Sequence, residues 1–144
     1  MSRDIEFRGK HIHILKENEK LNGTWVYGYL CDKSYIFSEE LGGDMLVDKN
    51  TIGQYTGLKD KNGKKIFEGD IVHYYDFTSV YSREITGKVI YSQDCMFKIE
   101  YDDEFIKNHK TTRPLVCNEH PIFAEKKIEV IGNIYENNLE SKGE

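Results

Sequence analysis

Histidine and cysteine side chains near the two ends of the chain are the groups most able to bind a metal or to act as nucleophiles. His11 and His13 are two positions apart, so on a β-strand both imidazoles lie on one face, a spacing that metal sites use. Cys117 and His120 are three positions apart, which is one half of a zinc-binding pattern. The sequence holds no matching second half. We therefore expect surface histidines and a reduced thiol, with no bound metal and no cofactor.

Nucleophilic catalysis would need a base and an orienting group beside the nucleophile. Nothing in the sequence assigns such partners to Cys117, so we interpret it as a lone thiol. Cys31, Cys95 and Cys117 are odd in number and irregularly spaced, which predicts reduced thiols rather than a disulfide framework. Glu68 and Asp70 resemble an acid pair, but the stronger interpretation is that Asp70 accepts backbone N–H bonds at a tight corner. The sequence thus predicts a protein without enzymatic activity.

Lysines gather in one short segment where they could contact phosphate groups. They are Lys59, Lys61, Lys64 and Lys65. Lysines are also ordinary on a solvated hairpin, where they discourage pairing between sheet edges. The formal net charge of −5 opposes nucleic-acid binding as the main task, because clustered Lys and Arg hold a phosphate backbone. The glycines are spaced as turns between strands and match no Walker or Rossmann pattern.

The segment from Thr51 to Val72 holds the four lysines and the pair of Glu68 and Asp70. Its residue types predict the order strand, turn, strand, corner, strand. The Asn62-Gly63 pair favours a tight hairpin loop, and Asp60 can accept a hydrogen bond from the backbone of that loop. Gly69 and Asp70 predict a second tight corner. We expect positive φ angles at Gly63 and Gly69, because glycine adopts them without steric cost.

Alternation of apolar and polar residues before this segment predicts an antiparallel meander. In its central strand, Trp25, Tyr27 and Tyr29 fall on one face. Residues 38–43 predict either one capped helical turn or a mobile loop. The expected strands are Asp4–Phe7, His11–Leu15, Thr24–Leu30, Tyr35–Phe37 and Met45–Val47. The expected connections include Arg8–Lys10 and Asp48–Asn50.

The C-terminal half predicts more strands, arranged like an SH3-like small barrel from about residue 66 to 136; this likeness concerns the fold and carries no function. Gly132 interrupts the closing strand and predicts a bulge or bend. We expect a loop at residues 102–113 and a frayed tail at 139–144. The expected strands are Ile71–Phe77, Arg83–Tyr91, Cys95–Tyr101 and Ile128–Tyr135.

Composition predicts one mostly-β domain, residues 1–138, in the cytoplasm. A chain of 144 residues fits one domain, which buries roughly 70% of its unfolded surface. Ten Tyr, seven Phe and one Trp supply packing area and favour strands. No segment reaches the roughly 18 consecutive apolar residues of a membrane helix, and the polar N-terminus is no signal peptide.

Several short motifs resemble the signature of the YopX family, small proteins of Gram-positive bacteria, their phages and prophages. The resemblance covers nearly the whole chain, and it implies a structural signature rather than catalytic residues, because the family has no established biochemical role. The signature residues are Tyr55, Gly57, Asp60, Gly63, Gly69 and Asp70. The similar motifs are Gln54–Leu58, Asp60, Asn62-Gly63 and Glu68–Val72, with Arg3–Lys10, Gly23–Gly28 and Val130–Asn137 nearer the ends.

These observations favour a non-enzymatic accessory protein, encoded by a phage or prophage, that binds another protein or a second copy of itself. An aromatic-rich β surface with free edges would make the contact. The alternative is nucleic-acid association through the Lys59–Lys65 hairpin and neighbouring tyrosines, since small barrels often serve that use. A third hypothesis, a metal-dependent enzyme, requires His11, His13, Cys117 and His120 to meet.

Overall fold

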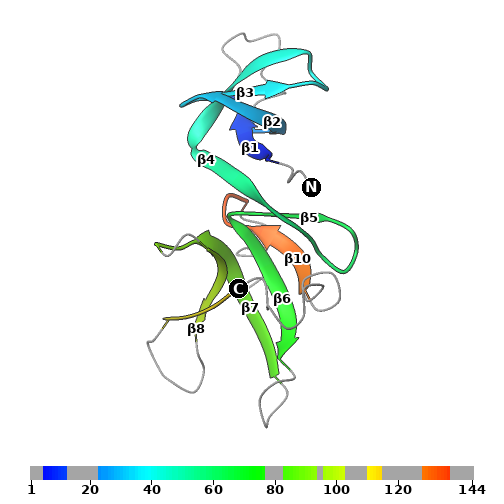
Figure 1. Cartoon of the computed structure of the whole chain (residues 1–144), viewed down its shortest axis with the longest axis vertical. Coiled ribbons are helices and arrows are strands. Elements are labelled where there is room, and N and C mark those ends of the chain that lie inside the picture. The colour runs from blue at the N-terminus through cyan, green and yellow to red at the C-terminus, as the bar shows by residue number, and fades with distance from the viewer. Residues whose placement is uncertain are drawn as a thin grey trace. The chain divides into compact units, whose positions relative to one another are not determined.

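The computed structural model describes residues 5–12, 23–76, 83–93, 96–102, 110–114 and 128–136. These ranges contain ten β-strands and no helix (Figure 1), which confirms the all-β prediction. Accordingly, no described segment is a helix long and apolar enough to cross a membrane. The chain divides into two compact units, Met1–Gly57 and Leu58–Glu144.

The strands of the N-terminal unit pair in a closed antiparallel ring. They are β1 (Phe7–His11), β2 (Trp25–Asp32), β3 (Tyr35–Ser38) and β4 (Gly43–Lys59). Each strand pairs with the next, as the predicted meander requires. β4 then returns to β1, so that Phe7 lies opposite Gln54 and His11 opposite Val47. The ring therefore encloses a small core of its own.

Val26, Ile36 and Val47 fill this core, and each is at most 1% exposed. Gly9 lies against them on β1, where a Cβ atom would be 2.9 Å from Cγ2 of Val47. The strands approach so closely at Gly9 that only a residue without a side chain fits.

The predicted turn at Arg8-Gly9-Lys10 is wrong. These residues lie inside β1, which runs without interruption from Phe7 to His11. Glycine between two charged residues is typical of a turn, but here it is required by the nearby core. Residues 13–15 of the second predicted strand lie outside the described residues.

The predicted connection at Asp48–Asn50 also lies inside a strand, because β4 continues for 17 residues. Its turn-forming side chains make local hydrogen bonds there: the Asp48 carboxylate accepts the Asn50 N–H at 3.0 Å, and the Thr51 hydroxyl donates to the Asp48 carbonyl at 2.6 Å. The Thr51 Oγ1 atom also accepts the N–H of Lys10 at 2.8 Å, where the pairing of β1 with β4 shifts register. The polar stretch thus forms an irregularity in β4, between Asp48 and Gly53, the two residues that pair with β1 on either side of it.

The segment after β3 forms a capped turn rather than a helix. Ser38 Oγ accepts the N–H of Leu41 at 3.1 Å, and the N–H of Gly42 donates to the Ser38 carbonyl at 2.8 Å. Gly42 has a φ of +80°, which ends the turn and leads into β4.

The C-terminal unit is built on a second antiparallel sheet with the order β10-β6-β7-β8-β9. Its strands are β6 (Asp70–Asp76), β7 (Arg83–Tyr91), β8 (Phe97–Asp102), β9 (Lys110–Pro114) and β10 (Ile128–Asn133). The short β5 (Lys65–Phe67) precedes them and pairs with β4. The register of β10 against β6 shifts between Val130 and Gly132, which confirms the predicted irregularity at Gly132.

One face of this sheet carries a second core, whose fully buried members include Ile66, Val72, Val89, Ile99 and Ile128. The predicted loop at residues 102–113 is wrong at its end, because Lys110–Pro114 pair with β8 as β9. Residues 103–109 lie outside the described part of the chain, as does the tail at 139–144. The SH3-like description of residues 66–136 stays a prediction.

Candidate functional site

The hairpin of the central segment is held by the carboxylate of Asp60, which is only 2% exposed. Its Oδ1 atom accepts the backbone N–H groups of Asn62 and Lys64, each at 2.9 Å. Its Oδ2 atom accepts the N–H of Val130 on β10, also at 2.9 Å. Gly63 has a φ of +81°, as predicted. Asp60 therefore builds the turn and fastens it to the C-terminal sheet.

The lysines of this hairpin are accompanied by an acidic residue of β10. The Nζ atom of Lys61 lies 3.8 Å from Oε1 of Glu129, and the Asn62 amide donates to Oε2 of Glu129 at 3.4 Å. Both charged side chains are at least 40% exposed, so water screens the pair. Lys59, Lys64 and Lys65 lie on or beside the same turn. Glu129 lowers the positive charge that the tip offers to a phosphate.

The predicted corner at Gly69 and Asp70 is confirmed. Asp70 is 1% exposed, and its Oδ2 atom accepts the N–H of Phe67 at 2.7 Å. Gly69 has a φ of +94°, and a Cβ atom there would lie 2.9 Å from the ring of Tyr135. Two further signature residues are structural too, since Gly57 has a φ of +89° and Tyr55 is 6% exposed.

Replacing Asp70 with alanine is expected to lower the free energy of unfolding by about 1 to 3 kcal/mol, because the buried N–H of Phe67 loses its acceptor. Chemical denaturation followed by circular dichroism measures this loss. Glu68→Ala at the neighbouring position is the control and is expected to change little. An unchanged midpoint for Asp70→Ala would contradict this structural role.

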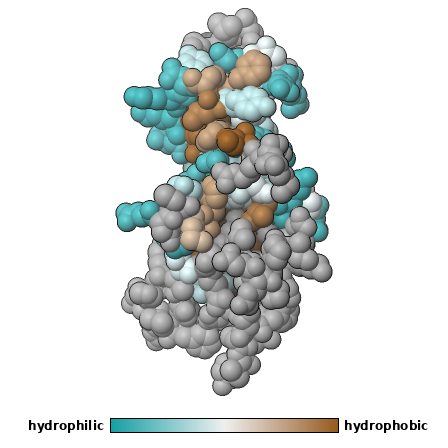
Figure 2. Space-filling model, in the orientation of Figure 1, coloured by the Kyte–Doolittle hydropathy of each residue, from teal (hydrophilic) through white to brown (hydrophobic). Residues whose placement is uncertain are grey.

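Four of the five exposed large aromatic side chains among the described residues lie on the outer side of the N-terminal ring. Tyr27, Tyr29, Tyr35 and Phe37 are between 38% and 57% exposed. Tyr29 lies opposite Phe37 in the pairing of β2 with β3, so the two rings share a face. Together with Trp25 these residues are called the aromatic face. Figure 2 shows hydrophobic residues gathered on the viewed side of this unit, with hydrophilic residues along both sides of them.

Two cations from β1 flank the aromatic face. The guanidinium carbon of Arg8 lies 4.3 Å from the centre of the Trp25 ring, and Nζ of Lys10 lies 4.6 Å from it. Lys10 is opposite Trp25 and Arg8 is opposite Tyr27 in the pairing of β1 with β2. Cation–π attraction therefore fixes the indole at this edge of the aromatic face.

Acidic residues flank the opposite side of the aromatic face. Asp44 on β4 is exposed and lies opposite Phe37. The exposed Glu39 and Glu40 follow β3 directly. The face is therefore bordered by negative charge beyond β3, whereas on the β1 side Arg8 is only 4% exposed and Lys10 lies opposite Asp48.

Cys31 lies near this acidic border, where its Sγ atom donates to Oδ1 of Asp44 at 3.5 Å. Local desolvation, the hydrogen bond to Asp44 and the negative charge of Asp44 raise the pKa of the Cys31 thiol. A raised pKa leaves less of the reactive thiolate at a given pH.

Iodoacetamide is therefore expected to alkylate Cys31 more slowly at pH 8 than an ordinary exposed thiol. Asp44→Asn removes the charge, lowers the pKa and should speed the reaction roughly two- to fivefold. Mass spectrometry of the peptide that contains Cys31 measures the rate separately from the other thiols. An equal rate in both proteins would show that Asp44 does not act on the thiol.

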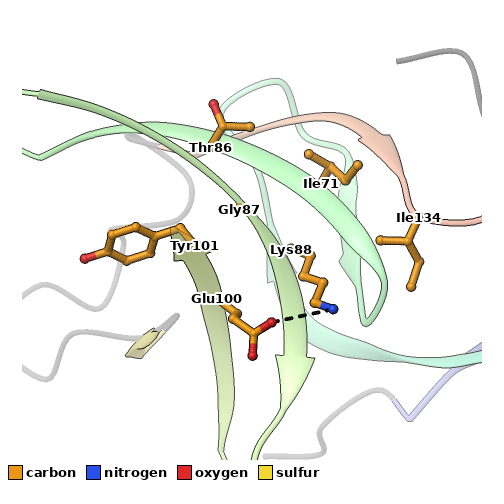
Figure 3. Close-up of a pocket in the computed structure, with 7 residues that line it drawn as sticks. All are labelled: Ile71, Thr86, Gly87, Lys88, Glu100, Tyr101 and Ile134. Atoms are coloured by element: carbon orange, nitrogen blue, oxygen red, sulfur yellow. Dashed lines mark ion pairs between the residues drawn. The ribbon is translucent and has the colours of Figure 1, made fainter. Parts of the chain in front are cut away.

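A shallow cavity of about 270 Å³ opens on the C-terminal sheet (Figure 3). Ile71 and Ile134 line one side, and Lys88 and Glu100 form an ion pair of 3.5 Å in the same opening. Gly87 also lines the opening, and a Cβ atom there would collide with the carbonyl oxygen of Glu100, so β7 and β8 approach closely at this point. The volume falls below the roughly 300 Å³ at which ligand pockets usually begin. The cavity can hold a small polar molecule but does not specify one.

A hydroxyl, an imidazole and a carboxylate lie in line beside this cavity. Thr86 Oγ1 is 3.0 Å from Nδ1 of His73, and Nε2 of His73 is 3.6 Å from Oε2 of Glu84. Such an order is found in nucleophilic triads. However, the Thr86 hydroxyl points away from Ile71 and Lys88 in Figure 3, so it is not directed toward a ligand in the cavity. We interpret the line as cross-strand pairing, since His73 and Thr86 are direct neighbours on β6 and β7.

The candidate metal ligands of the sequence are not brought together in the described residues. His11 is 7% exposed and lies on β1, whereas His13, Cys117 and His120 fall outside the described ranges. Within those ranges, no group of three or more His, Cys, Asp or Glu side chains could hold a metal ion.

The sequence alone predicted neither the full aromatic face nor the arrangement of Thr86, His73 and Glu84 side by side. Alternation placed Trp25, Tyr27 and Tyr29 on one face, but the addition of Phe37 and the two cations depends on strand register. Register is set by pairing between distant segments, and no local motif in this chain marked it.

Comparison with protein-family models matches residues 7–140 to the family described as YopX protein. A search of curated proteins found no match. The matched range includes the hairpin held by Asp60, the corner at Asp70 and the whole aromatic face. The chain therefore belongs to the YopX family.

Proposed function

We propose that the protein is a non-enzymatic interaction module, encoded by a phage or prophage and active in the cytoplasm, that binds protein through the aromatic face. The observation that carries this proposal is the exposure of Tyr27, Tyr29, Tyr35 and Phe37 on adjacent strands. Exposed aromatic groups are enriched in protein interfaces because each buries a large area with few rotatable bonds. The exposed Glu39, Glu40 and Asp44 beside the face disfavour a uniformly negative polymer there.

The alternative is nucleic-acid association through the hairpin of Lys59, Lys61, Lys64 and Lys65. It has less support, because Glu129 lies 3.8 Å from Lys61 and partly offsets the charge of the tip. An electrophoretic shift of a labelled oligonucleotide that weakens with added salt and is lost on replacing Lys61 and Lys64 would favour this alternative instead.

Photo-crosslinking tests the proposal directly. A benzophenone amino acid at the position of Tyr29, which is 57% exposed, is expected to give protein adducts in the natural host cell. The matched control carries the same group at Tyr91, an aromatic residue of the C-terminal unit that is 49% exposed, and is expected to give none of these adducts. Adducts removed by nuclease, or no adducts specific to Tyr29, would overturn the proposal.

A further inference from the structure

Asn62 and Gly63 at the tip of the hairpin form a dipeptide that can react with itself. The backbone nitrogen of the second residue attacks the side-chain carbonyl carbon of the Asn, ammonia leaves, and a five-membered succinimide ring remains. Water then opens the ring to give aspartate, or isoaspartate, in which the main chain runs through the former side chain. Glycine in the second position leaves the nitrogen open to attack, because it has no side chain to obstruct the ring. Asn is for this reason a thermolabile residue.

The hairpin holds the attacking nitrogen of Gly63 in another bond. The Gly63 N–H donates to the carbonyl oxygen of Asp60 at 3.0 Å, and this bond closes the turn. The nitrogen must lose that proton to attack, so ring closure requires the turn to open. The N–H groups of Asn62 and Lys64 both donate to the Asp60 carboxylate at 2.9 Å. They fix the backbone on either side of Gly63 and resist the rotation that brings the two reacting groups together.

Strand β10 restrains the second reacting group, the side-chain amide of Asn62. Its nitrogen, which must leave as ammonia, donates to Oε2 of Glu129 at 3.4 Å. The backbone of the tip is fixed to the same strand, because the N–H of Lys61 donates to the carbonyl oxygen of Ile128 at 2.9 Å. The hairpin thus holds the nucleophile, and β10 holds the leaving group.

We propose that Asn62 is a site of spontaneous deamidation, and that docking of the hairpin on β10 through Asp60 and Glu129 keeps it unreacted. Reaction then proceeds only from the fraction of molecules in which the hairpin has opened, since local segments open more often than the whole fold. Water is the only co-reactant: Asn and water give aspartate or isoaspartate, and ammonia is released.

The product does not fit the docked hairpin. An aspartate or isoaspartate at this position puts a carboxylate where the Asn62 amide donated to Glu129, and two carboxylates in contact repel each other. Isoaspartate also adds one methylene carbon to the main chain, inside a turn whose length is fixed by its hydrogen bonds. Both products therefore favour the open hairpin, and the modification releases it from β10 in one direction only.

Peptide mass spectrometry of the full chain follows the reaction as a mass increase of about one dalton in the peptide that contains Asn62. At mildly alkaline pH, Asn62 in the native protein is expected to react at least roughly tenfold more slowly than in the same chain unfolded in guanidinium chloride. Asn22-Gly23 is the same dipeptide, so in the unfolded chain it should react at a similar rate and serves as the internal reference. Equal rates at Asn62 in the native and unfolded chains, or no reaction there in the unfolded chain, would overturn the proposal.

Glu129→Ala separates the effect of docking from that of general stability. It removes only exposed contacts, so the denaturation midpoint should stay close to that of the wild type, while Asn62 should react about two- to threefold faster. Glu84→Ala removes an exposed carboxylate of β7 and is the matched control, with an unchanged rate at Asn62. An unchanged rate in the Glu129→Ala protein, or an equal increase in both variants, overturns the assignment of the protection to β10.

Discussion

Gly28→Ala is expected to unfold the N-terminal unit. A Cβ atom at this position would collide with the carbonyl oxygen of Phe37 and lie 2.9 Å from its carbonyl carbon. Both contacts are with backbone, so no side-chain rotation relieves them, and β2 must separate from β3. Ile36 and Val26 lie beside this contact and would lose their packing. We expect the unfolding free energy to fall by more than about 4 kcal/mol, which is exceptional for one substitution.

Fluorescence of Trp25 measures this effect, because the chain has one tryptophan and it lies in the affected ring. Gly43→Ala, on β4 of the same ring, is the matched control. The nearest atom to a Cβ atom there is the terminal methyl of Met45 at 3.9 Å, an ordinary contact, so its denaturation midpoint should stay close to that of the wild type. A Gly28→Ala protein with a wild-type midpoint would show that β2 and β3 are not paired in this register.

Asp60→Ala is expected to lower the unfolding free energy by about 3 to 5 kcal/mol. Three backbone N–H groups, those of Asn62, Lys64 and Val130, lose their acceptor together. Asn62 and Lys64 belong to the turn, whereas Val130 belongs to β10. Loss of the carboxylate therefore releases the hairpin from the sheet in addition to weakening the turn.

Hydrogen exchange at the amides of Asn62, Lys64 and Val130, combined with chemical denaturation, tests this prediction. Asp60→Asn keeps one acceptor oxygen and should lose less stability than Asp60→Ala. Glu129→Ala is the control, because it removes only the exposed contacts to Lys61 and the Asn62 amide and should cost less than about 1 kcal/mol. Equal protection of Val130 in the Asp60→Ala and wild-type proteins would rule out the link to β10.

The features that could be predicted from sequence are those that a few neighbouring residues determine. Asp60 and Gly63 define the hairpin, and Gly69 with Asp70 defines the corner, because each turn places its donor, acceptor and positive φ within five positions. β7 was predicted with its observed bounds of Arg83–Tyr91 because both its ends are marked by polar residues. Local chemistry was sufficient in these cases.

The features that were missed depend on distant pairing. Gly9 carries the local signature of a turn, yet it lies within β1 because Val47 and Ile36 leave no room for a side chain. Residues 48–50 also have the composition of a connection, but they lie within β4, which pairs with β1 at Asp48 and again at Gly53 across a shift of register. The aromatic face assembles for the same reason, from strands whose register no single segment contains.

Ring closure also has a consequence for how the protein is made. Phe7 pairs with Gln54, so contacts that complete the ring join positions 7 and 54 of the chain. During synthesis the first three strands leave the ribosome before the second half of β4. Until that half emerges, one edge of β1 has no strand to pair with. At roughly 5 to 20 residues per second, this interval lasts on the order of a second, long enough for a chaperone to engage the nascent segment.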